Sequence, residues 1–231
     1  MAKAIKRFLK TRFPSLYEMA WPHSSMGGAT VEATFTKKFH RHRARHMDSL
    51  SGPGSDLAQT AAVRRRLPEL LRELQCSSLL DLPCGDFYWM NTLELDIDYV
   101  GGDIVAELIA RNQQQYAGAR RAFRRLDLQQ DDLPATDFVL CRDCLVHFSN
   151  REVTLALRNI KRSGSRYLLT TTFINRDRNS DIVTGKWRPL NLQRAPFGLP
   201  APIELIDEAH PVRRYRDKQL GLWKFDAIPE L

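Results

Sequence analysis

From residue 57 to residue 173 the sequence alternates short apolar runs with longer amphipathic segments, and this alternation constrains the fold more than any other feature. Each apolar run has the length and the β-branched or aromatic content of a buried strand. We expect strands at residues 78–82, 99–102, 123–126, 137–141 and 166–173, and helices at 57–74, 105–116 and 149–161. Strands that alternate with helices predict a parallel sheet covered on both faces, which is the α/β class.

Two of these helices carry boundary signals. Pro68 suits the first turn of a helix, so the helix at 57–74 is expected to be interrupted or to restart there. Ser149 and Glu152 have the spacing of a capping box, which predicts the start of the third helix. Beyond residue 173 a loop reaches residue 201, and strand candidates follow at 203–206 and 220–228. Because no strong helix separates them, we expect them to extend the sheet edge in antiparallel orientation.

The first 55 residues show no lasting period of 2 or 3.6, and they carry the positive charge. The chain has a formal net charge of +8. Residues 1–66 hold 13 basic and 4 acidic residues, against 22 and 23 in residues 67–231, and the run at 37–46 reads KKFHRHRARH. We therefore expect a basic N-terminal extension at 1–55 and one near-neutral domain at 56–231. This distribution argues against a uniformly basic nucleic-acid binder.

Neither a membrane span nor a signal peptide is expected. No apolar run approaches the ~18 residues that a span needs, and the N-terminus lacks the apolar stretch of a secretory signal. Its Ile5, Phe8 and Leu9 share one helical face among basic residues. Two interpretations of that face stay open, peripheral contact with an anionic membrane and packing on the protein's own domain. Four cysteines without even spacing indicate reduced thiols and a cytoplasmic protein.

Acidic residues follow three successive strands, at the edge where doubly wound sheets bind ligands. Asp81 ends the first strand, Asp103 the second and Asp127 the third. The interval from Asp81 to Asp103 is close to the spacing of about 20 residues at which a carboxylate binds ribose hydroxyls. Each acid alone is more typical of a helix cap or a solvated turn, but three in order indicate a ligand site. The turn after Asp81 holds one glycine, Gly85, which gives poor support for the three-glycine loop of a dinucleotide site.

Four segments resemble, in order, the motifs of class I S-adenosylmethionine-dependent methyltransferases. They are DLPCGDF at 81–87, YVGGD at 99–103, LDLQQDDLP at 126–134 and DFVLCRDCLVHF at 137–148. The resemblance covers roughly residues 55–175. Pro83 and Phe87 stand where the usual D/E-x-G-x-G-x-G motif has its first and third glycines. Within the superfamily, the chain is similar to a bacterial group of small-molecule or glycan-type methyltransferases.

The resemblance implies the Rossmann-like methyltransferase fold, a doubly wound, mostly parallel sheet of seven strands with the last one antiparallel. It also implies S-adenosylmethionine as cofactor. Asp81 and Gly85 would lie by its methionine end and Asp103 by its ribose. Asp127 and Leu128 would face its adenine. The cofactor-binding residues expected from the motifs are Asp81, Cys84, Gly85, Asp103, Ile104, Asp127, Leu128 and Arg142.

The segment after the fourth strand carries the groups that we expect to face a methyl acceptor. Asp143 and His147 are four residues apart, so they share one face of a turn or helix start. A hydroxyl acceptor needs a base; His147 or Asp143 is assigned that role, with Arg142 as a clamp for an anionic or polyhydroxyl substrate. The alternative is that His147 packs beside the cofactor and moves no proton. Cys141 and Cys144 lack a second ligand pair at zinc-site spacing, so we interpret them as buried thiols and expect no metal.

Two flanking loops, at 51–55 and 175–193, are expected to border the site. Trp187 in the second suits a sugar or another polar ring, and the alternatives for this loop are a homodimer contact or a mobile surface. The function expected is methyl transfer to a small polar acceptor, a saccharide or another natural product. The alternatives are a nucleic-acid-binding or RNA- or DNA-modifying protein that uses the basic extension, and a nicotinamide oxidoreductase, which the single glycine disfavours.

Overall fold

A computed structural model of the 231-residue chain describes residues 30–45 and 47–228. In this part of the chain seven strands form one sheet in the order β3-β2-β1-β4-β5-β7-β6. The strands are β1 (Ser78–Asp81), β2 (Asp98–Asp103), β3 (Arg121–Arg125), β4 (Phe138–Cys141), β5 (Tyr167–Phe173), β6 (Glu204–Asp207) and β7 (Lys218–Lys224). β1 to β5 are parallel, and β7 runs antiparallel to both β5 and β6. The predicted doubly wound, mostly parallel, seven-stranded sheet is confirmed.

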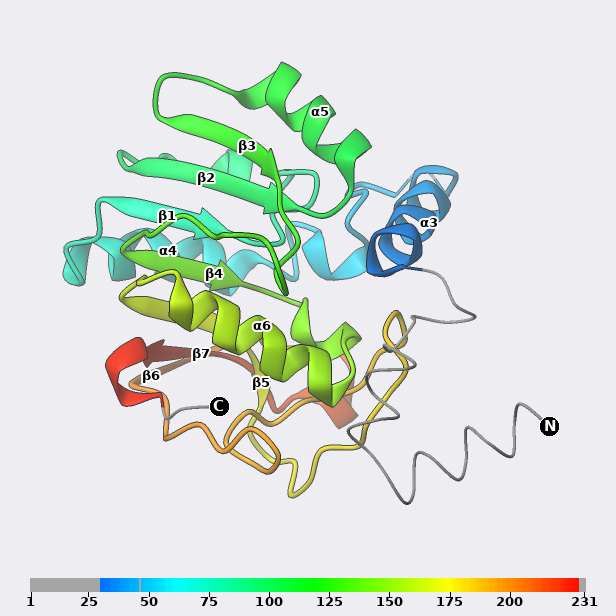
Figure 1. Ribbon diagram of the computed structural model, residues 1–231, viewed down its shortest axis with the longest axis vertical. Helices are drawn as coiled ribbons and strands as arrows, with labels where there is room; N and C mark the ends of the chain where they lie inside the picture. The colour runs from blue at the N-terminus through cyan, green and yellow to red at the C-terminus, as the bar shows by residue number, and fades with distance from the viewer. Residues whose placement is uncertain (1–29, 46, 229–231) are drawn as a thin grey trace.

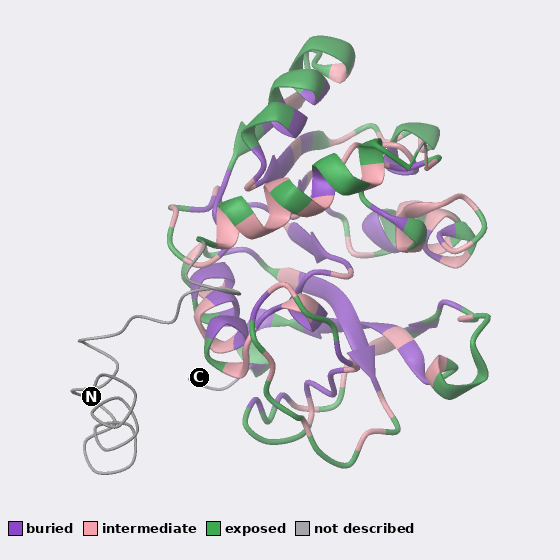
Figure 2. Ribbon diagram, turned by 90° about the vertical axis from the view of Figure 1, so that its right-hand side faces the viewer, coloured by how far each residue is buried: buried purple, intermediate pink, exposed green. Residues whose placement is uncertain are grey.

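Helices cover both faces of this sheet (Figure 1). The α-helices are α3 (Val31–Arg43), α4 (Ala61–Glu73), α5 (Ala106–Tyr116) and α6 (Asn150–Arg162), and short 3₁₀ turns occupy Pro53–Ser55, Met90–Thr92, Leu145–His147, Arg213–Tyr215 and Phe225–Ala227. Successive residues of a strand point to opposite faces. Leu79 accordingly packs into the core that α4 and α5 share, and Leu80 into the core of α6. Buried residues run along the strands, while exposed ones gather on the outer turns of the helices and in loops (Figure 2).

Most predicted elements agree with the structure to within two residues, and two differ by more. The helix predicted from residue 57 begins at Ala61 and runs through Pro68 without interruption. It tolerates the proline because Val63, Leu67 and their neighbours bury a continuous apolar stripe against the sheet. The strand predicted to reach residue 228 ends at Lys224, since β5 offers no strand partner beyond the pair of Tyr167 and Lys224.

The order of the strands reverses between β1 and β4. After β1 the chain adds β2 and β3 on one side, and then returns to add β4 and β5 on the other. Ligands of doubly wound sheets bind at such a reversal, outside the carboxyl ends of the strands. The arrowheads of β1, β2, β3 and β4 all point toward the side on which α3 lies (Figure 1). Helix α3 therefore covers the edge where a ligand is expected.

Helix α3 contains most of the basic run at 37–46, for which the sequence predicted no regular structure. Thr30 caps its first turn with a side-chain hydrogen bond. Val31, Phe35 and Phe39 follow at intervals of four residues, so they form one apolar stripe. Phe39 is buried against the residues that begin α5. This stripe attaches the basic segment to the sheet domain.

Two further sequence predictions concern the ends of the chain. The face with Ile5, Phe8 and Leu9 lies outside the described residues. The division into an extension at 1–55 and a domain at 56–231 stays a prediction. Across residues 30–45 and 47–228, no helix combines the length and the apolar character needed to cross a membrane.

Replacing Ser149 by alanine is expected to lower the free energy of unfolding by about 1 kcal/mol. Ser149 and Glu152 form the predicted capping box, in which each side chain accepts a hydrogen bond from the other residue's N–H. Alanine leaves a first-turn N–H without its acceptor. Urea unfolding measures the change. The exposed Arg151→Ala in the same turn should shift stability by less than about 0.5 kcal/mol, and equal losses in the two variants would contradict the capping role.

Candidate active site

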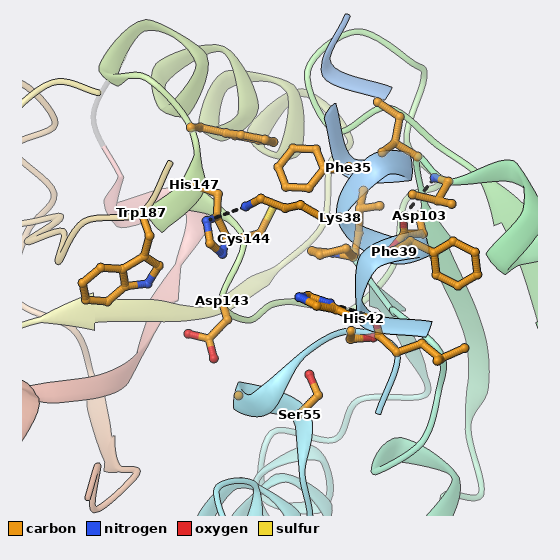
Figure 3. Close-up of a pocket in the computed structure, with 18 of the residues that line it drawn as sticks. Phe35, Lys38, Phe39, His42, Ser55, Asp103, Asp143, Cys144, His147 and Trp187 are labelled. Atoms are coloured by element: carbon orange, nitrogen blue, oxygen red, sulfur yellow. Dashed lines mark hydrogen bonds between the residues drawn. The ribbon is translucent and has the colours of Figure 1, made fainter. Parts of the chain in front are cut away.

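A cavity of about 500 Å³ lies between the carboxyl ends of the strands and helix α3. Its volume falls within the roughly 300–1,000 Å³ that is typical of small-molecule sites. Residues of α3, including Lys38 and His42, face the strand ends across it, and Ser55 and Trp187 border it from the two flanking loops (Figure 3). Both loops that were expected to flank the site therefore contribute to its wall.

Most of the residues predicted for the site meet at this cavity. Those that line it are Asp103, Ile104, Asp127, Leu128, Asp143 and His147. The others do not border it and are buried or half-buried: Asp81, Cys84, Gly85 and Arg142. The ends of four parallel strands thus bring together residues that are far apart in the sequence.

Asp103, at the end of β2, is buried and held by main-chain donors. Its carboxylate accepts hydrogen bonds from the Val105 N–H at 3.0 Å and from the Gly85 N–H at 3.3 Å. Burial raises the pKa of Asp103 to about 6, although these hydrogen bonds oppose the rise. The carboxylate is fixed in position and can still accept hydrogen bonds from ligand hydroxyls.

Asp81, at the end of β1, is buried in the same region. The Tyr99 hydroxyl donates a hydrogen bond to its carboxylate at 2.7 Å. Burial raises the pKa of Asp81 to about 7, and the neighbouring Asp103 adds to the rise. Two adjacent carboxyl groups whose ionised forms are disfavoured by burial make this part of the fold favourable for a cationic ligand.

The turn after β1 is attached to the segment that precedes the sheet. The Asp86 carboxylate accepts hydrogen bonds from the Leu50 N–H at 2.6 Å and from the hydroxyls of Ser49 and Ser51. Gly85 has a φ of 55°, and a Cβ atom at this position would lie 2.0 Å from the Ser51 Oγ. Any other residue there would strain the backbone and push Ser51 away. The one glycine of the turn therefore permits the close approach of residues 49–51.

Asp127 and Leu128, which follow β3, supply a polar and an apolar contact to the cavity. The Asp127 carboxylate accepts hydrogen bonds from the Gln129 N–H at 2.9 Å and from the Gln130 side-chain amide at 2.7 Å. Leu128 is buried. An acceptor group beside an apolar surface suits a flat heterocycle that carries an exocyclic donor.

Asp143 belongs to a buried network of charges at the end of β4. The Lys218 Nζ lies 2.7 Å from its carboxylate and the Arg142 Nη1 lies 3.3 Å away. Glu208 binds the same two cations, Arg142 at 2.6 Å and Lys218 at 3.0 Å. Burial opposes ionisation of Asp143, but the charges of Arg142 and Lys218 outweigh it and lower its pKa to about 2. Asp143 is consequently an ionised, paired carboxylate and a poor proton acceptor.

Two of the three guanidinium nitrogens of Arg142 donate to protein groups, and the buried Nη2 has no hydrogen-bond partner among the described residues. Arg142 donates to Glu208 and, through Nη1 at 2.7 Å, to the Gly54 carbonyl. Its side chain is only 4% exposed. Arg142 thus links β4 to the turn at Pro53–Ser55, and its role as a substrate clamp stays a prediction.

His147 borders the cavity and lies beside Lys38 and Phe35 of α3 (Figure 3). Its Nδ1 lies 2.7 Å from the Lys186 carbonyl oxygen and 3.2 Å from the Lys38 Nζ. A carbonyl oxygen only accepts and an ammonium only donates, so the two contacts favour opposite roles for Nδ1. The Lys186 contact is the shorter one, and it favours a proton on Nδ1 with Nε2 as an acceptor. Burial, followed by the charge of Lys38, lowers the pKa of His147 to about 4. The ring is therefore neutral at pH 7.

Comparison with known proteins gives a match in fold alone. No protein-family model and no curated protein matches the sequence. Human N-acetylserotonin methyltransferase, solved in complex with SAM, aligns with a TM-score of 0.58 at 12% identity, over 94% of this chain and 68% of that one. The chain thus spans about two thirds of that protein's length. The chain has the class I methyltransferase fold.

Other methyltransferases align less completely. Magnesium protoporphyrin IX methyltransferase from Synechocystis PCC 6803, with bound SAH, gives a TM-score of 0.45 at 17% identity over 62% of this chain and 70% of that one. The sugar N-methyltransferase KedS8 from Streptoalloteichus gives 0.41 at 23% identity over 52% and 49%.

Within this methyltransferase fold, the cavity also has lining residues that the sequence did not indicate. Lys38 and His42 come from α3, and Tyr215 and Lys218 come from the segment that leads into β7. Trp187, which was expected near the site, packs against Tyr215 with 4.8 Å between ring centroids. The stripe with a period of four residues in α3 is the signal that would have found Lys38 and His42, since it fixes which face of that helix meets the sheet.

The cysteines near the site are buried thiols, as predicted. Cys141 and Cys144 are both free, and Cys144 borders the cavity. In the described ranges, no group of three or more His, Cys, Asp and Glu side chains is arranged to hold a metal ion.

We expect the His147 ring to titrate near pH 4 rather than near its ordinary pKa of 6.5. Between these values an unfolded histidine binds a proton that the folded one does not, so His147 makes stability rise with pH across this interval. Nitrogen NMR of the ring as a function of pH measures the value, and the His147→Gln protein identifies the signal. Lys38→Met should raise the pKa because it removes a positive charge. Titration of His147 near pH 6.5 in both the wild-type and the Lys38→Met protein would contradict the structure.

Proposed function

We propose that the protein is an S-adenosylmethionine-dependent methyltransferase that acts on a small polar acceptor. The observation that carries the proposal is the position of Asp103 and Asp127 on a ligand-sized cavity, with Asp81 close by, at the carboxyl edge of a sheet with the methyltransferase fold. S-adenosylmethionine carries a sulfonium, an ammonium and two ribose hydroxyls. Buried carboxylates can stabilise these cations and accept hydrogen bonds from these hydroxyls.

In this proposal, different cofactor-binding residues contact different parts of S-adenosylmethionine. Asp103 accepts the hydrogen bonds of the ribose hydroxyls, and Ile104 packs beside it. Asp127 and Leu128 provide the polar and the apolar contact for the adenine. This arrangement follows the order of β2 and β3 in the sheet.

The methionine end is assigned to the turn after β1. Asp81 lies there with a pKa raised to about 7 by burial, so a cation nearby would favour its ionised form. Cys84 and Gly85 form the turn itself, and the Arg142 side chain lies close enough to Asp81 to influence its charge. These four residues fit a ligand whose amino acid end is zwitterionic.

When bound, S-adenosylmethionine supplies a methyl group on a positively charged sulfur. A nucleophile that lies in line with the carbon–sulfur bond can take this methyl group, and the sulfur is the leaving group. The chain has to hold the acceptor in that line and take up its proton. We assign the proton to the Nε2 of His147, since Nδ1 is bonded to the Lys186 carbonyl. Asp143 suits this role less well because Lys218 and Arg142 lower its pKa to about 2.

The charges of α3 bear on the choice between this proposal and nucleic-acid binding. Arg43 and His40 lie 2.6 Å and 3.6 Å from the Glu107 carboxylate. Lys38 and His42 line the cavity. Part of the basic run thus faces the cavity or pairs with an acidic side chain, and this part is less available to phosphates. We therefore favour a small-molecule or glycan acceptor over a nucleic acid.

The proposal also includes a cytoplasmic location. Cys76, Cys84, Cys141 and Cys144 are all free thiols, which is typical of proteins from a reducing compartment. Assembly into a homodimer stays a prediction.

Replacing Asp103 by alanine should weaken binding of S-adenosylmethionine and S-adenosylhomocysteine by roughly 1.5–3 kcal/mol, the range for hydrogen bonds to a charged group. Isothermal titration calorimetry measures both ligands. Absence of wild-type binding at millimolar ligand would refute the proposed function.

The matched control for this prediction is Asp98→Ala, which changes the other end of β2. Asp98 is exposed and pairs with Arg120, so its removal should leave cofactor affinity unchanged. Asp103→Asn keeps the size of the side chain and separates loss of charge from loss of packing. If Asp98→Ala weakened ligand binding as much as Asp103→Ala does, the assignment of the ribose site would be wrong.

A further inference from the structure

Lys38 is a half-buried cation on the wall of the cavity. Its Nζ lies 3.2 Å from His147 Nδ1 and 5.1 Å from the centroid of the Phe35 ring. The side chain extends from α3 toward His147, on the same side of the cavity as Cys144 (Figure 3). It therefore lies near the end of β4, where the methyl acceptor is expected.

Lys38 differs in its partners from Lys218 and Arg142, the two buried cations near the cavity. Lys218 and Arg142 share Asp143 and Glu208. For Lys38, no carboxylate among residues 30–45 and 47–228 lies within 4.0 Å. Its contacts are an imidazole and an aromatic ring, which do not neutralise an ammonium group.

Partial burial without a counter-ion is unfavourable for this ammonium. Burial, followed by the charge of Arg41, lowers the pKa of Lys38 to about 8, so it is still mainly protonated at pH 7. A positive sulfur from the cofactor would add to the local charge. Both effects favour a negatively charged ligand group beside Lys38.

We propose that the methyl acceptor carries a carboxylate, and that Lys38 binds it beside His147. The inference rests on the proposed methyltransferase function and names the class of acceptor. We assign a carboxylate as this negatively charged group, and phenyl phosphate in the test below distinguishes it from a phosphate. Trp187 and Tyr215 border the same cavity and provide aromatic surface for the rest of the acceptor.

The carboxylate would also affect the proton transfer. In the protein alone, burial and the charge of Lys38 keep the pKa of His147 at about 4, so the ring is a weak base. An acceptor carboxylate that pairs with Lys38 offsets this charge, and the proton affinity of Nε2 rises. The ring thus becomes a better base when such an acceptor is bound.

The test is calorimetric binding of matched probes to the protein saturated with S-adenosylhomocysteine. The pairs are D-galacturonate with D-galactose, and benzoate with benzamide, with phenyl phosphate as the dianion. At least one carboxylate should bind, and its neutral partner should bind roughly tenfold more weakly or worse. Lys38→Met should abolish this preference and leave the affinity for S-adenosylhomocysteine unchanged, whereas Lys38→Arg should keep part of the preference.

Lys37→Met is the matched control, since Lys37 is the exposed neighbour on α3 and does not line the cavity. It should retain the preference of the wild-type protein. Equal binding of charged and neutral partners, absence of binding by both carboxylates, or tighter binding of phenyl phosphate than of benzoate would overturn the inference. Loss of S-adenosylhomocysteine affinity in Lys38→Met would also overturn it, by assigning Lys38 to the cofactor. Failure of the wild-type protein to bind S-adenosylhomocysteine refutes the proposed function instead, and the inference with it.

Discussion

Carboxyl groups buried at the ends of parallel strands impose the main requirement on this site. Parallel strands end at one edge of a sheet, so the buried Asp81 and Asp103 are brought close to Asp143, whose side chain is 25% exposed. Each is stabilised differently. Asp81 accepts a tyrosine hydroxyl, Asp103 accepts main-chain N–H groups, and Asp143 binds Lys218 and Arg142. The first two have raised pKa values and the third a lowered one. One edge therefore offers both a region suited to cations and a region that is already neutralised.

A further aspartate at this edge holds the segment that covers the cavity. Asp86 binds residues 49–51, and this contact holds the end of the segment that carries α3 against the turn after β1. Arg142 reaches the Gly54 carbonyl from the other side. In the part that is described, helix α3 and the turn at Pro53–Ser55 thus line the cavity together with the strand ends.

The sheet and the strand-end acids were predictable because their signals are local. They can be read from the order of residues along the chain. Examples are the apolar runs of strand length, the capping box at Ser149 and the interval between Asp81 and Asp103. Helix α3 was not predicted, since it buries a single residue, Phe39, and its many charges conceal the stripe that contains it. The positions of Lys38 relative to His147 and of Arg142 relative to Glu208 depend on packing between segments 66 to 109 residues apart, and no local pattern specifies such contacts.

The cavity is lined by two kinds of segment, the ends of strands and more variable helix and loop surfaces. Asp103 ends β2, which pairs with β1 and β3, and Asp127 follows β3, which pairs with β2. The sheet therefore fixes the positions of both residues. Lys38 and Trp187 come from a helix surface and a loop, where a side chain can be exchanged without altering any strand pair. Over generations the two sides can diverge at different rates. Descendants of one ancestral chain could keep the acids at the strand ends and acquire different ligands through a few substitutions in α3 and in the loop that holds Trp187.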